Sequence, residues 1–371
     1  MRIAFLVTRS DTIGGSHIHV RDLAKALGEN GNDVTIFIGG SGPLLKYFKD
    51  FGLNITNIPS LKRNISPIND LKVFFHIKRE LKRFGPDIIS THSSKAGFLG
   101  RLAANQLKIP VLFTAHGWSF TTGKNSTRRF LYKSLEKIVA PKTDRLITVS
   151  DYDKKLALEH LPIPPEKVMT IHNGMPDNDE SFRADTGREN PVHIVMIARF
   201  DHQKDHLELL EAVHSIQNIH LHFVGDGPLI SIVKEKAREY NILDQITLWG
   251  RLESVDEVLA KGQIFALISN WEGFPRSTLE AMRAGLPTVV SDVGGAAEAL
   301  EHKRTGYVVT KGDIDGLRTA IKELVQDPER RKEMGNAARK RYENFYTFET
   351  MYKRTFDVYQ EVLNANPKEE N

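Results

Sequence analysis

The chain has 371 residues, 40% of them hydrophobic, which is enough for two domains, because a single hydrophobic core stops growing at about 250–300 residues. It contains no cysteine, which excludes disulfides, thiolate metal sites and a cysteine nucleophile. The sequence has neither an apolar run of about 18 residues nor the features of a signal peptide, so we expect a cytoplasmic protein.

The net charge of +4 is divided unevenly along the chain. Residues 1–175 carry 26 Lys and Arg against 14 Asp and Glu, whereas residues 176–371 carry 25 against 33. A basic half favours anionic partners such as phosphates or the inner face of the cytoplasmic membrane, although a basic surface can also serve only solubility. Nucleic acid is not an expected partner, because no aromatic residues are interleaved with the basic ones.

The first half begins with a continuous apolar strand over residues 2–8, a Gly-Gly turn and an amphipathic helix over residues 17–31. A second strand follows at residues 33–39, and strand–helix–strand units of this spacing build parallel sheets that are buried on both faces. Further strands are predicted at residues 87–93, 111–117 and 145–150.

The same pattern restarts at residue 192. Strands are predicted at residues 192–200, 221–228, 245–250, 264–270, 288–295 and 305–309. Residues 162–191 are rich in Pro, Asn, Asp and Gly and suit a linker. We therefore expect an α/β protein with an N-terminal Rossmann-like domain over residues 1–175, a C-terminal one over 176–349, and a final helix over about 350–371 that packs back on the first domain.

Ligands of open parallel sheets bind beyond the carboxyl ends of the strands, so residues just after strands are candidates. The most informative segment, EGFPRSTLEAMRAGLP, follows the strand at 264–270 and places Glu272 and Glu280 on a loop and the helix after it. A helix N-terminus offers unpaired N–H groups to a phosphate or to sugar hydroxyls, here from Phe274, Arg276 and Ser277, while Pro275 stiffens the turn. The two carboxylates can alternatively serve only to favour the helix start.

The run EGFPRSTLEAMRAGLPTVVSDVGGAAEAL closely resembles the donor-binding signature of retaining glycosyltransferases of family 4. This resemblance implies the GT-B fold, in which two Rossmann-like domains with parallel sheets face a central cleft. It also implies that Glu272, with Gly273 beside it, contacts the donor sugar and that Glu280 holds the nucleotide ribose. Arg283 stands where the family usually has a small residue.

A second match lies after the strand at 192–200, in ARFDHQKDH. There the resemblance implies that Arg199 and Lys204 contact the donor diphosphate. Two fixed cations at a leaving diphosphate stabilise the transition state more than the ground state. By themselves, these two residues would more often be ordinary surface charges.

Weaker matches complete the predicted site. Gly14 and Gly15 follow the first strand and are expected near the donor phosphates, and His116 is expected to contact the donor sugar or its phosphate across the cleft. His92 and Lys95 are candidates for the acceptor side. Turns after two later strands are expected at the donor and its base, and Asn173-Gly174 resembles the family's hinge; the turn residues are Gly225, Asp226, Gly227, Gly250, Arg251 and Leu252.

The resemblance implies retention of anomeric configuration, with front-side attack assisted by the departing phosphate, so Glu272 binds the sugar without being an obligate nucleophile. We expect no cofactor and no metal, since Arg199 and Lys204 supply positive charge and no Asp-x-Asp metal motif stands in a plausible loop. The predicted catalytic set is Glu272, His116, Arg199 and Lys204.

The predicted activity is transfer of a hexose or N-acetylhexosamine from a nucleotide-diphosphate sugar, by family preference a UDP-sugar, to a saccharide or a polyprenyl-diphosphate-linked saccharide. The helix at 70–84, with Leu71, Phe74, Phe75, Lys78 and Leu81 along one side, is either a peripheral membrane helix or an ordinary core-facing helix. A basic cluster adds to the membrane hypothesis, and it consists of Lys124, Arg128, Arg129, Lys133 and Lys137.

Three alternatives remain open at this point. A sugar-nucleotide 2-epimerase of the same architecture would bind the same donor without an acceptor, and a non-catalytic protein could bind the sugar nucleotide for regulation. A nicotinamide-dependent oxidoreductase is disfavoured, because the Gly14-Gly15 turn is not the G-x-G-x-x-G dinucleotide fingerprint.

Overall fold

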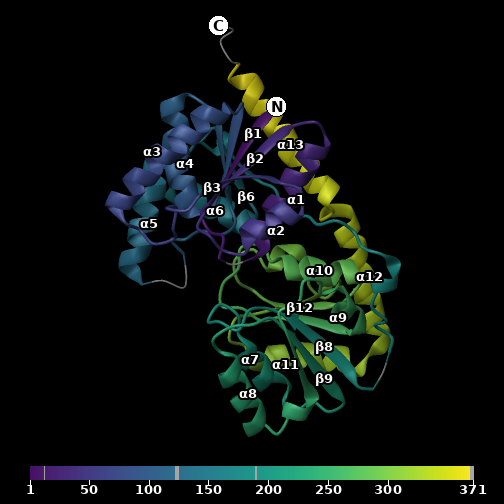
Figure 1. The fold of residues 1–371 in the computed structure, drawn as a ribbon. Helices are drawn as coiled ribbons and strands as arrows, with labels where there is room; N and C mark the ends of the chain where they lie inside the picture. The colour runs from purple at the N-terminus through teal and green to yellow at the C-terminus, as the bar shows by residue number, and fades with distance from the viewer. Residues whose placement is uncertain (12, 122–124, 189, 368–371) are drawn as a thin grey trace. The chain divides into compact units, whose positions relative to one another are not determined.

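The computed structural model describes the whole chain except residues 12, 122–124, 189 and 368–371, so Lys124 of the basic cluster lies outside the described residues. Contacts divide the chain into an N-terminal unit, Met1–His172 with Tyr352–Asn371, and a C-terminal unit, Asn173–Met351. Each unit is a parallel sheet covered by helices on both faces (Figure 1). The predicted fold class is confirmed.

The N-terminal sheet has the strand order β3-β2-β1-β4-β5-β6-β7 among the described residues, and every pair is parallel. Its strands are β1 (Arg2–Val7), β2 (Asp33–Gly39), β3 (Asn54–Ile58), β4 (Ile88–His92), β5 (Val111–Ala115), β6 (Arg145–Thr148) and β7 (Val168–Thr170). The helices of this unit are α1 (Gly15–Glu29), α2 (Leu44–Asp50), α3 (Pro67–Phe84), α4 (Ser94–Leu107), α5 (Ser126–Val139), α6 (Asp151–His160) and most of α13 (Phe348–Ala365). The short strand β7 lies inside the stretch expected to be a linker.

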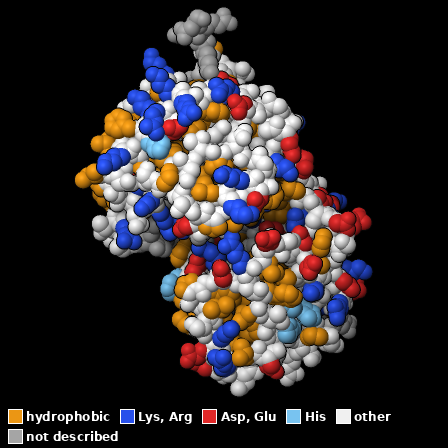
Figure 2. Space-filling model, in the orientation of Figure 1, with side chains coloured by type: hydrophobic (Ala, Val, Ile, Leu, Met, Phe, Trp, Pro, Cys, Tyr) orange, Lys and Arg blue, Asp and Glu red, His pale blue; other side chains and the backbone are white. Residues whose placement is uncertain are grey.

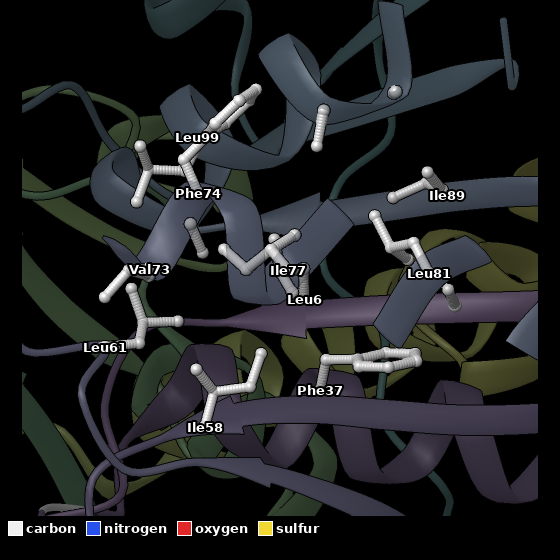
Figure 3. Packing of buried hydrophobic residues seen from close by; sticks show 14 of the residues in the cluster. Leu6, Phe37, Ile58, Leu61, Val73, Phe74, Ile77, Leu81, Ile89 and Leu99 are labelled. Atoms are coloured by element: carbon white, nitrogen blue, oxygen red, sulfur yellow. The ribbon is translucent and has the colours of Figure 1, made fainter. Parts of the chain in front are cut away.

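The core of this unit follows from the alternation of side chains along its strands. Ala4 and Leu6 of β1 point to the face covered by α3 and α4, where they join Phe37, Ile77 and other buried residues in one apolar cluster (Figure 3). Since successive side chains alternate, the residues between them face the opposite layer. A parallel sheet covered on both faces therefore needs the nearly continuous apolar strands that the sequence shows.

Helix α3 packs one of its faces into the core, as one of the two alternatives expected. Its buried face is formed by Val73, Phe74, Ile77 and Leu81, all part of the apolar cluster, so the core-facing interpretation is right for these residues. The expected single apolar side is wrong in detail, because Leu71 and Phe75 are each 58% exposed. A helical period of 3.6 residues carries them around the helix, away from the cluster.

The C-terminal sheet has the order β10-β9-β8-β11-β12-β13 among the described residues, again parallel throughout. Its strands are β8 (Val192–Ile197), β9 (Ile219–Val224), β10 (Ile246–Gly250), β11 (Ile264–Leu267), β12 (Thr288–Ser291) and β13 (Gly306–Val309). Its helices are α7 (His206–Val213), α8 (Ile230–Glu239), α9 (Asp256–Lys261), α10 (Arg276–Ala284), α11 (Ile314–Gln326) and α12 (Pro328–Phe345). Each predicted strand of this half is present.

The chain leaves and re-enters the N-terminal unit at segments that are hydrogen-bonded to each other. Met175 donates its N–H to the carbonyl of Tyr346 at 3.1 Å, and its own carbonyl accepts from Phe348 at 2.8 Å. Helix α13 begins just there, and from Tyr352 onward it belongs to the N-terminal unit. Among the described residues, none of the helices combines the length and apolar character that crossing a bilayer requires.

Candidate functional site

The C-terminal unit brings Lys204 and Glu272 into a direct ion pair. The two side chains follow β8 and β11, which are neighbours in the sheet, and their loops are hydrogen-bonded together. Asp205 donates its N–H to the carbonyl of Ile268 at 2.9 Å, and Asn270 donates to that of Gln203 at 2.8 Å. The Lys204 and Glu272 side chains are only 12% and 6% exposed, so each charge depends on the other for compensation.

Glu280 lies on α10, which follows the Glu272 loop, and is half-buried. Within the part of the chain that the structure describes, its carboxylate makes neither a hydrogen bond nor an ion pair. Burial raises the pKa of Glu280, and the nearby charges of Arg276 and Arg283 oppose that rise. A half-buried carboxylate with open lone pairs is well suited to accept hydrogen bonds from hydroxyl groups of a ligand.

The N-terminus of α10 has no side-chain cap, a feature that it shares with α8 and α9 but not with the other helices of this unit. Asp205, Asp313 and Asp327 cap α7, α11 and α12 through their side chains. Helix α10 instead begins after Pro275, which provides no side-chain cap. The first turn of an α-helix has backbone N–H groups without an intrahelical partner, and such groups, that of Ser277 among them, suit an anionic ligand.

The other cations of the predicted donor site lie nearer the surface. Arg199 is 63% exposed and pairs with Asp201 at 2.8 Å, and the structure does not bring it into the Lys204–Glu272 pair. Arg251 follows β10 and is exposed, and Leu252 beside it is half-buried. Lys204 is thus the predicted cation that the fold itself fixes, whereas Arg199 and Arg251 can move to meet a ligand.

The predicted glycines after β9 lie where two strand-end loops are in close backbone contact. A Cβ on Gly225 would lie 2.1 Å from the carbonyl oxygen of Ala198, beside Arg199, and one on Gly227 would lie 2.4 Å from that of Phe200. Both glycines have φ values open essentially only to glycine. Gly294, in the Gly-Gly pair of the signature, is equally constrained, because its Cβ would lie 1.9 Å from the carbonyl oxygen of Glu272.

In the N-terminal unit, four polar side chains form a hydrogen-bonded series ending at His116. The Tyr359 hydroxyl, from α13, donates to the Ser90 hydroxyl at 2.9 Å. Ser90 lies 3.1 Å from Nε2 of His92, and Nδ1 of His92 lies 3.0 Å from Nε2 of His116. Both His92 and Tyr359 are almost completely buried.

The direction of this series fixes where the protons lie. Because Ser90 accepts from Tyr359, its own proton can be donated to Nε2 of His92, and we expect the tautomer of His92 that carries its proton on Nδ1. Burial keeps the pKa of His92 well below its ordinary value, so the ring is neutral at pH 7. In this tautomer His92 donates to Nε2 of His116, and we therefore expect a neutral His116 to carry its own proton on Nδ1.

Two further histidines near this series, His17 and His19, were not predicted from the sequence. Gly14 caps α1, Gly15 begins it, and the N–H of Gly14 donates to Nδ1 of His17 at 3.2 Å. Burial first, and then the charge of Arg9, lowers the pKa of His17 to about 4.

The ring of His19 packs edge-on against His116, with the ring centroids 4.9 Å apart. Ring nitrogens of His19, His92 and His116 lie within 4.8 Å of one another, a spacing a metal ion could use. Both nitrogens of His92, however, are already engaged in hydrogen bonds. Lys95, the other acceptor-side candidate, pairs with Asp70 at 2.5 Å.

Comparisons with known proteins agree with this arrangement. Residues 177–341 match the family model of Glycosyl transferases group 1, and residues 13–179 match that of Glycosyltransferase Family 4. The chain is 31% identical to the UDP-Gal:alpha-D-GlcNAc-diphosphoundecaprenol alpha-1,3-galactosyltransferase of Escherichia coli, over 80% of each protein. It is 26% identical to the O-antigen biosynthesis glycosyltransferase WbnH of Escherichia coli, over 84% of this chain and 87% of that protein.

Solved structures show the same fold. Anabaena Alr3699/HepE in complex with UDP and glucose matches with a TM-score of 0.84 at 17% identity, covering 97% of this chain and 100% of that one. A glycosyltransferase from Rickettsia africae matches with a TM-score of 0.81 at 21% identity, covering 97% and 98%.

The fold and the matched domains define a GT-B glycosyltransferase. More particularly, the chain belongs to glycosyltransferase family 4. This assignment favours sugar transfer over the 2-epimerase, the non-catalytic binder and the oxidoreductase.

The Gly294 contact generates a prediction. Gly294→Ala should lower kcat/KM by roughly 100-fold, because the new methyl group must push the Glu272 backbone by about 1 Å or more. Gly312→Ala is the matched control, since Gly312 also has a positive φ, +79°, but nothing lies within 4 Å of its Cβ position. Steady-state kinetics and circular dichroism of both variants measure the difference, and equal losses of activity would contradict it.

The hydrogen-bonded series generates a second prediction. Tyr359→Phe removes the donor that orients Ser90, so the rings of His92 and His116 should become mixtures of both tautomers. Two-bond ¹H–¹⁵N spectra of histidine-labelled protein, assigned with a His116→Gln sample, report the tautomers directly. Tyr352→Phe, on the same helix, should leave them unchanged. A wild-type His116 protonated on Nε2 would refute the deduced direction.

Proposed function

We propose that this enzyme transfers a hexose or N-acetylhexosamine, with retention of anomeric configuration, from a UDP-sugar to a saccharide carried on polyprenyl diphosphate. The E. coli relative is named for a UDP-galactose donor and a diphosphoundecaprenol-linked GlcNAc acceptor. The Anabaena protein of the same fold has been solved with UDP-glucose. These names support the proposed donor and acceptor classes.

The observation that carries the proposal is the combination of polar groups around α10. Lys204 and Glu272 are fixed against each other, Glu280 has an open carboxylate, and the helix N-terminus has no side-chain cap. A sugar nucleotide contains the matching groups in one molecule: sugar hydroxyls, a diphosphate and a ribose. Few other ligands need acidic, basic and backbone N–H partners on the loops and the helix that follow two neighbouring strands.

Each group then has a role. Glu272 accepts hydroxyls of the donor sugar, and Glu280 accepts those of the ribose. An ammonium has three N–H donors, so Lys204 can contact a diphosphate oxygen while it remains bonded to Glu272. The α10 N–H groups and Arg199 add positive potential where the leaving diphosphate gains charge. Backbone groups at Arg251 and Leu252 are assigned to the base.

The chemical step follows from these assignments. Positioning and electrostatics lower the barrier, and the departing diphosphate oxygen takes up the proton of the attacking acceptor hydroxyl. Glu272 holds the sugar without forming a covalent bond to it. His116, protonated on Nδ1, is assigned to donate a hydrogen bond to the donor sugar or its phosphate.

Peripheral contact of the N-terminal unit with an anionic membrane is part of the proposal. Ile68, Phe75 and Phe130 are 78%, 58% and 74% exposed. Basic residues of the same helices, including Lys72, Arg79 and Arg128, are also exposed. Figure 2 shows hydrophobic and basic side chains interspersed on the side where Figure 1 places α3 and α5. This mixture suits a bilayer surface that carries anionic lipids.

Donor binding is tested by thermal unfolding with a panel of nucleotide sugars. A donor present at 100 times its Kd should add about 2.7 kcal/mol of stability, because it binds the native state. Lys204→Ala and Glu280→Ala should each abolish most of the shift in Tm. Lys332→Ala, an exposed lysine of the same unit, should retain it. A full ligand-induced shift in Tm in both Lys204→Ala and Glu280→Ala would contradict the proposed donor site.

Metal independence is tested separately. Since Lys204, Arg199 and the α10 N-terminus are proposed to supply the positive charge at the diphosphate, transfer should persist in excess EDTA at close to its full rate. The measurement is product formation with EDTA, with and without added Mn²⁺. A complete loss of transfer that Mn²⁺ restores would show that a metal carries this role.

A further inference from the structure

The N-terminal unit contains an apolar pocket of about 470 Å³ between α3, α4 and α5. Its wall is largely hydrophobic and includes Leu71, Phe74, Phe98, Leu99, Leu102 and Leu135. Phe74 and Leu99 also belong to the buried core, so the floor of the pocket is the outer surface of that core. A volume in the range of small-molecule sites, with a lining of this kind, is suited to an apolar ligand.

One end of this pocket is polar and lies close to the histidine series. Ser94 and Lys95 line it and begin α4, directly after the strand that carries His92. The Ser94 hydroxyl is hydrogen-bonded to that of Ser119, in the loop that follows His116. The pocket therefore leads from exposed apolar side chains on α3 toward the strand ends where the predicted reaction occurs.

The pocket lining also contains two cations, Arg63 and Lys95. Lys95 pairs with Asp70 and also donates to the carbonyl of Asn64 at 2.5 Å, which places the neighbouring Arg63 at the same end of the pocket. Arg63 is exposed, and its charge also reaches Asp11 in the loop after β1. Glu136, also in the lining, is neutralised by buried Arg101. Arg63 thus gives this end a positive charge that Asp70 and Glu136 do not cancel.

We infer that this pocket binds the first isoprene units of a polyprenyl-diphosphate acceptor. The order of groups along the site is apolar wall, cations and histidines, and the order along such an acceptor is prenyl chain, diphosphate and saccharide. Arg63 and Lys95 contact the diphosphate, and the saccharide extends toward His116. This inference rests on the proposed function, because it specifies the acceptor of the same reaction.

The occupant is a single lipid chain, as distinct from the bilayer surface. A bilayer contact needs exposed apolar side chains and surface charge, which Ile68 and Phe75 provide without any pocket. The cavity extends inward to buried Leu99 and half-buried Leu102, a depth that suits a chain leaving the bilayer better than a flat bilayer surface. The two kinds of contact therefore depend on different residues of α3.

Titration calorimetry with farnesyl diphosphate and inorganic diphosphate, without membranes, tests the pocket. Leu71→Asp places a charge on its wall at an exposed position, so folding should be unaffected. It should weaken farnesyl diphosphate binding about tenfold or more, and inorganic diphosphate binding less than twofold. Ile68→Asp is the matched control on the same helix, outside the pocket lining. It should leave both affinities unchanged while lowering co-sedimentation with anionic vesicles.

Leu102→Gln, deeper in the pocket, provides a second variant, and it should weaken farnesyl diphosphate binding as much as Leu71→Asp does. Unchanged farnesyl diphosphate binding in both Leu71→Asp and Leu102→Gln would overturn the inference. Equal losses in Leu71→Asp and Ile68→Asp would do so as well, because they would indicate a surface contact only.

Transfer kinetics distinguish failure of the pocket from failure of the proposed function. Two soluble acceptors carry the same N-acetylglucosamine diphosphate, esterified to methanol in one and to farnesol in the other. Wild-type enzyme should prefer the farnesyl acceptor by about tenfold in kcat/KM, and Leu71→Asp should remove the preference. Equal use of both acceptors would overturn the pocket alone. Use of neither, with any donor that binds, would overturn the proposed acceptor.

Discussion

The ion pair between Lys204 and Glu272 is the contact on which the C-terminal site depends. Each side chain is almost covered by protein, and a charge left alone in such a place would cost several kcal/mol. The pair therefore holds the loop after β8 and the loop after β11 to one geometry. Because it is neutral as a whole, it adds no net repulsion toward either the diphosphate or the sugar hydroxyls. In the proposed complex Lys204 donates directly to the diphosphate, and Arg199 and the α10 N-terminus add net positive potential there.

The glycines of the site serve this same constraint. Gly225 and Gly227 let the loop after β9 lie directly on the carbonyl groups of Ala198 and Phe200. Gly294 lets the loop after β12 lie directly on the carbonyl group of Glu272. The loops after four neighbouring strands, β9, β8, β11 and β12, are thus packed in pairs, backbone against backbone, with no room for a methyl group at these glycines. This packing fixes the backbone of the loops that carry the proposed donor site. A glycine in a signature motif can therefore be required because it lets two loops approach closely, even where it does not contact the ligand.

The sequence predicted the parallel strands and the strand-end residues because both depend on local patterns. Continuous apolar runs mark strands buried on both faces, and the long signature around Glu272 is specific in itself. Where local pattern was weak, the predictions missed. The edge strand β3 carries polar Asn54, Thr56 and Asn57, and β7 is three residues long among prolines. The faces of α3 were also misassigned, since Leu71 and Phe75 are apolar yet exposed.

The hydrogen-bonded series at His116 was beyond local reasoning for a different reason. Ser90 and Tyr359 are separated by 269 positions in sequence, and neither belongs to a motif. Their contact exists because α13 begins in the C-terminal unit and continues along the sheet of the N-terminal unit. The final helix thus closes the core of the first unit and also supplies the phenol that sets the direction of the hydrogen bonds. The tautomer that we expect for His116 consequently depends on a helix at the far end of the chain, and a fragment ending before α13 would retain the histidines but lose the Tyr359 hydroxyl.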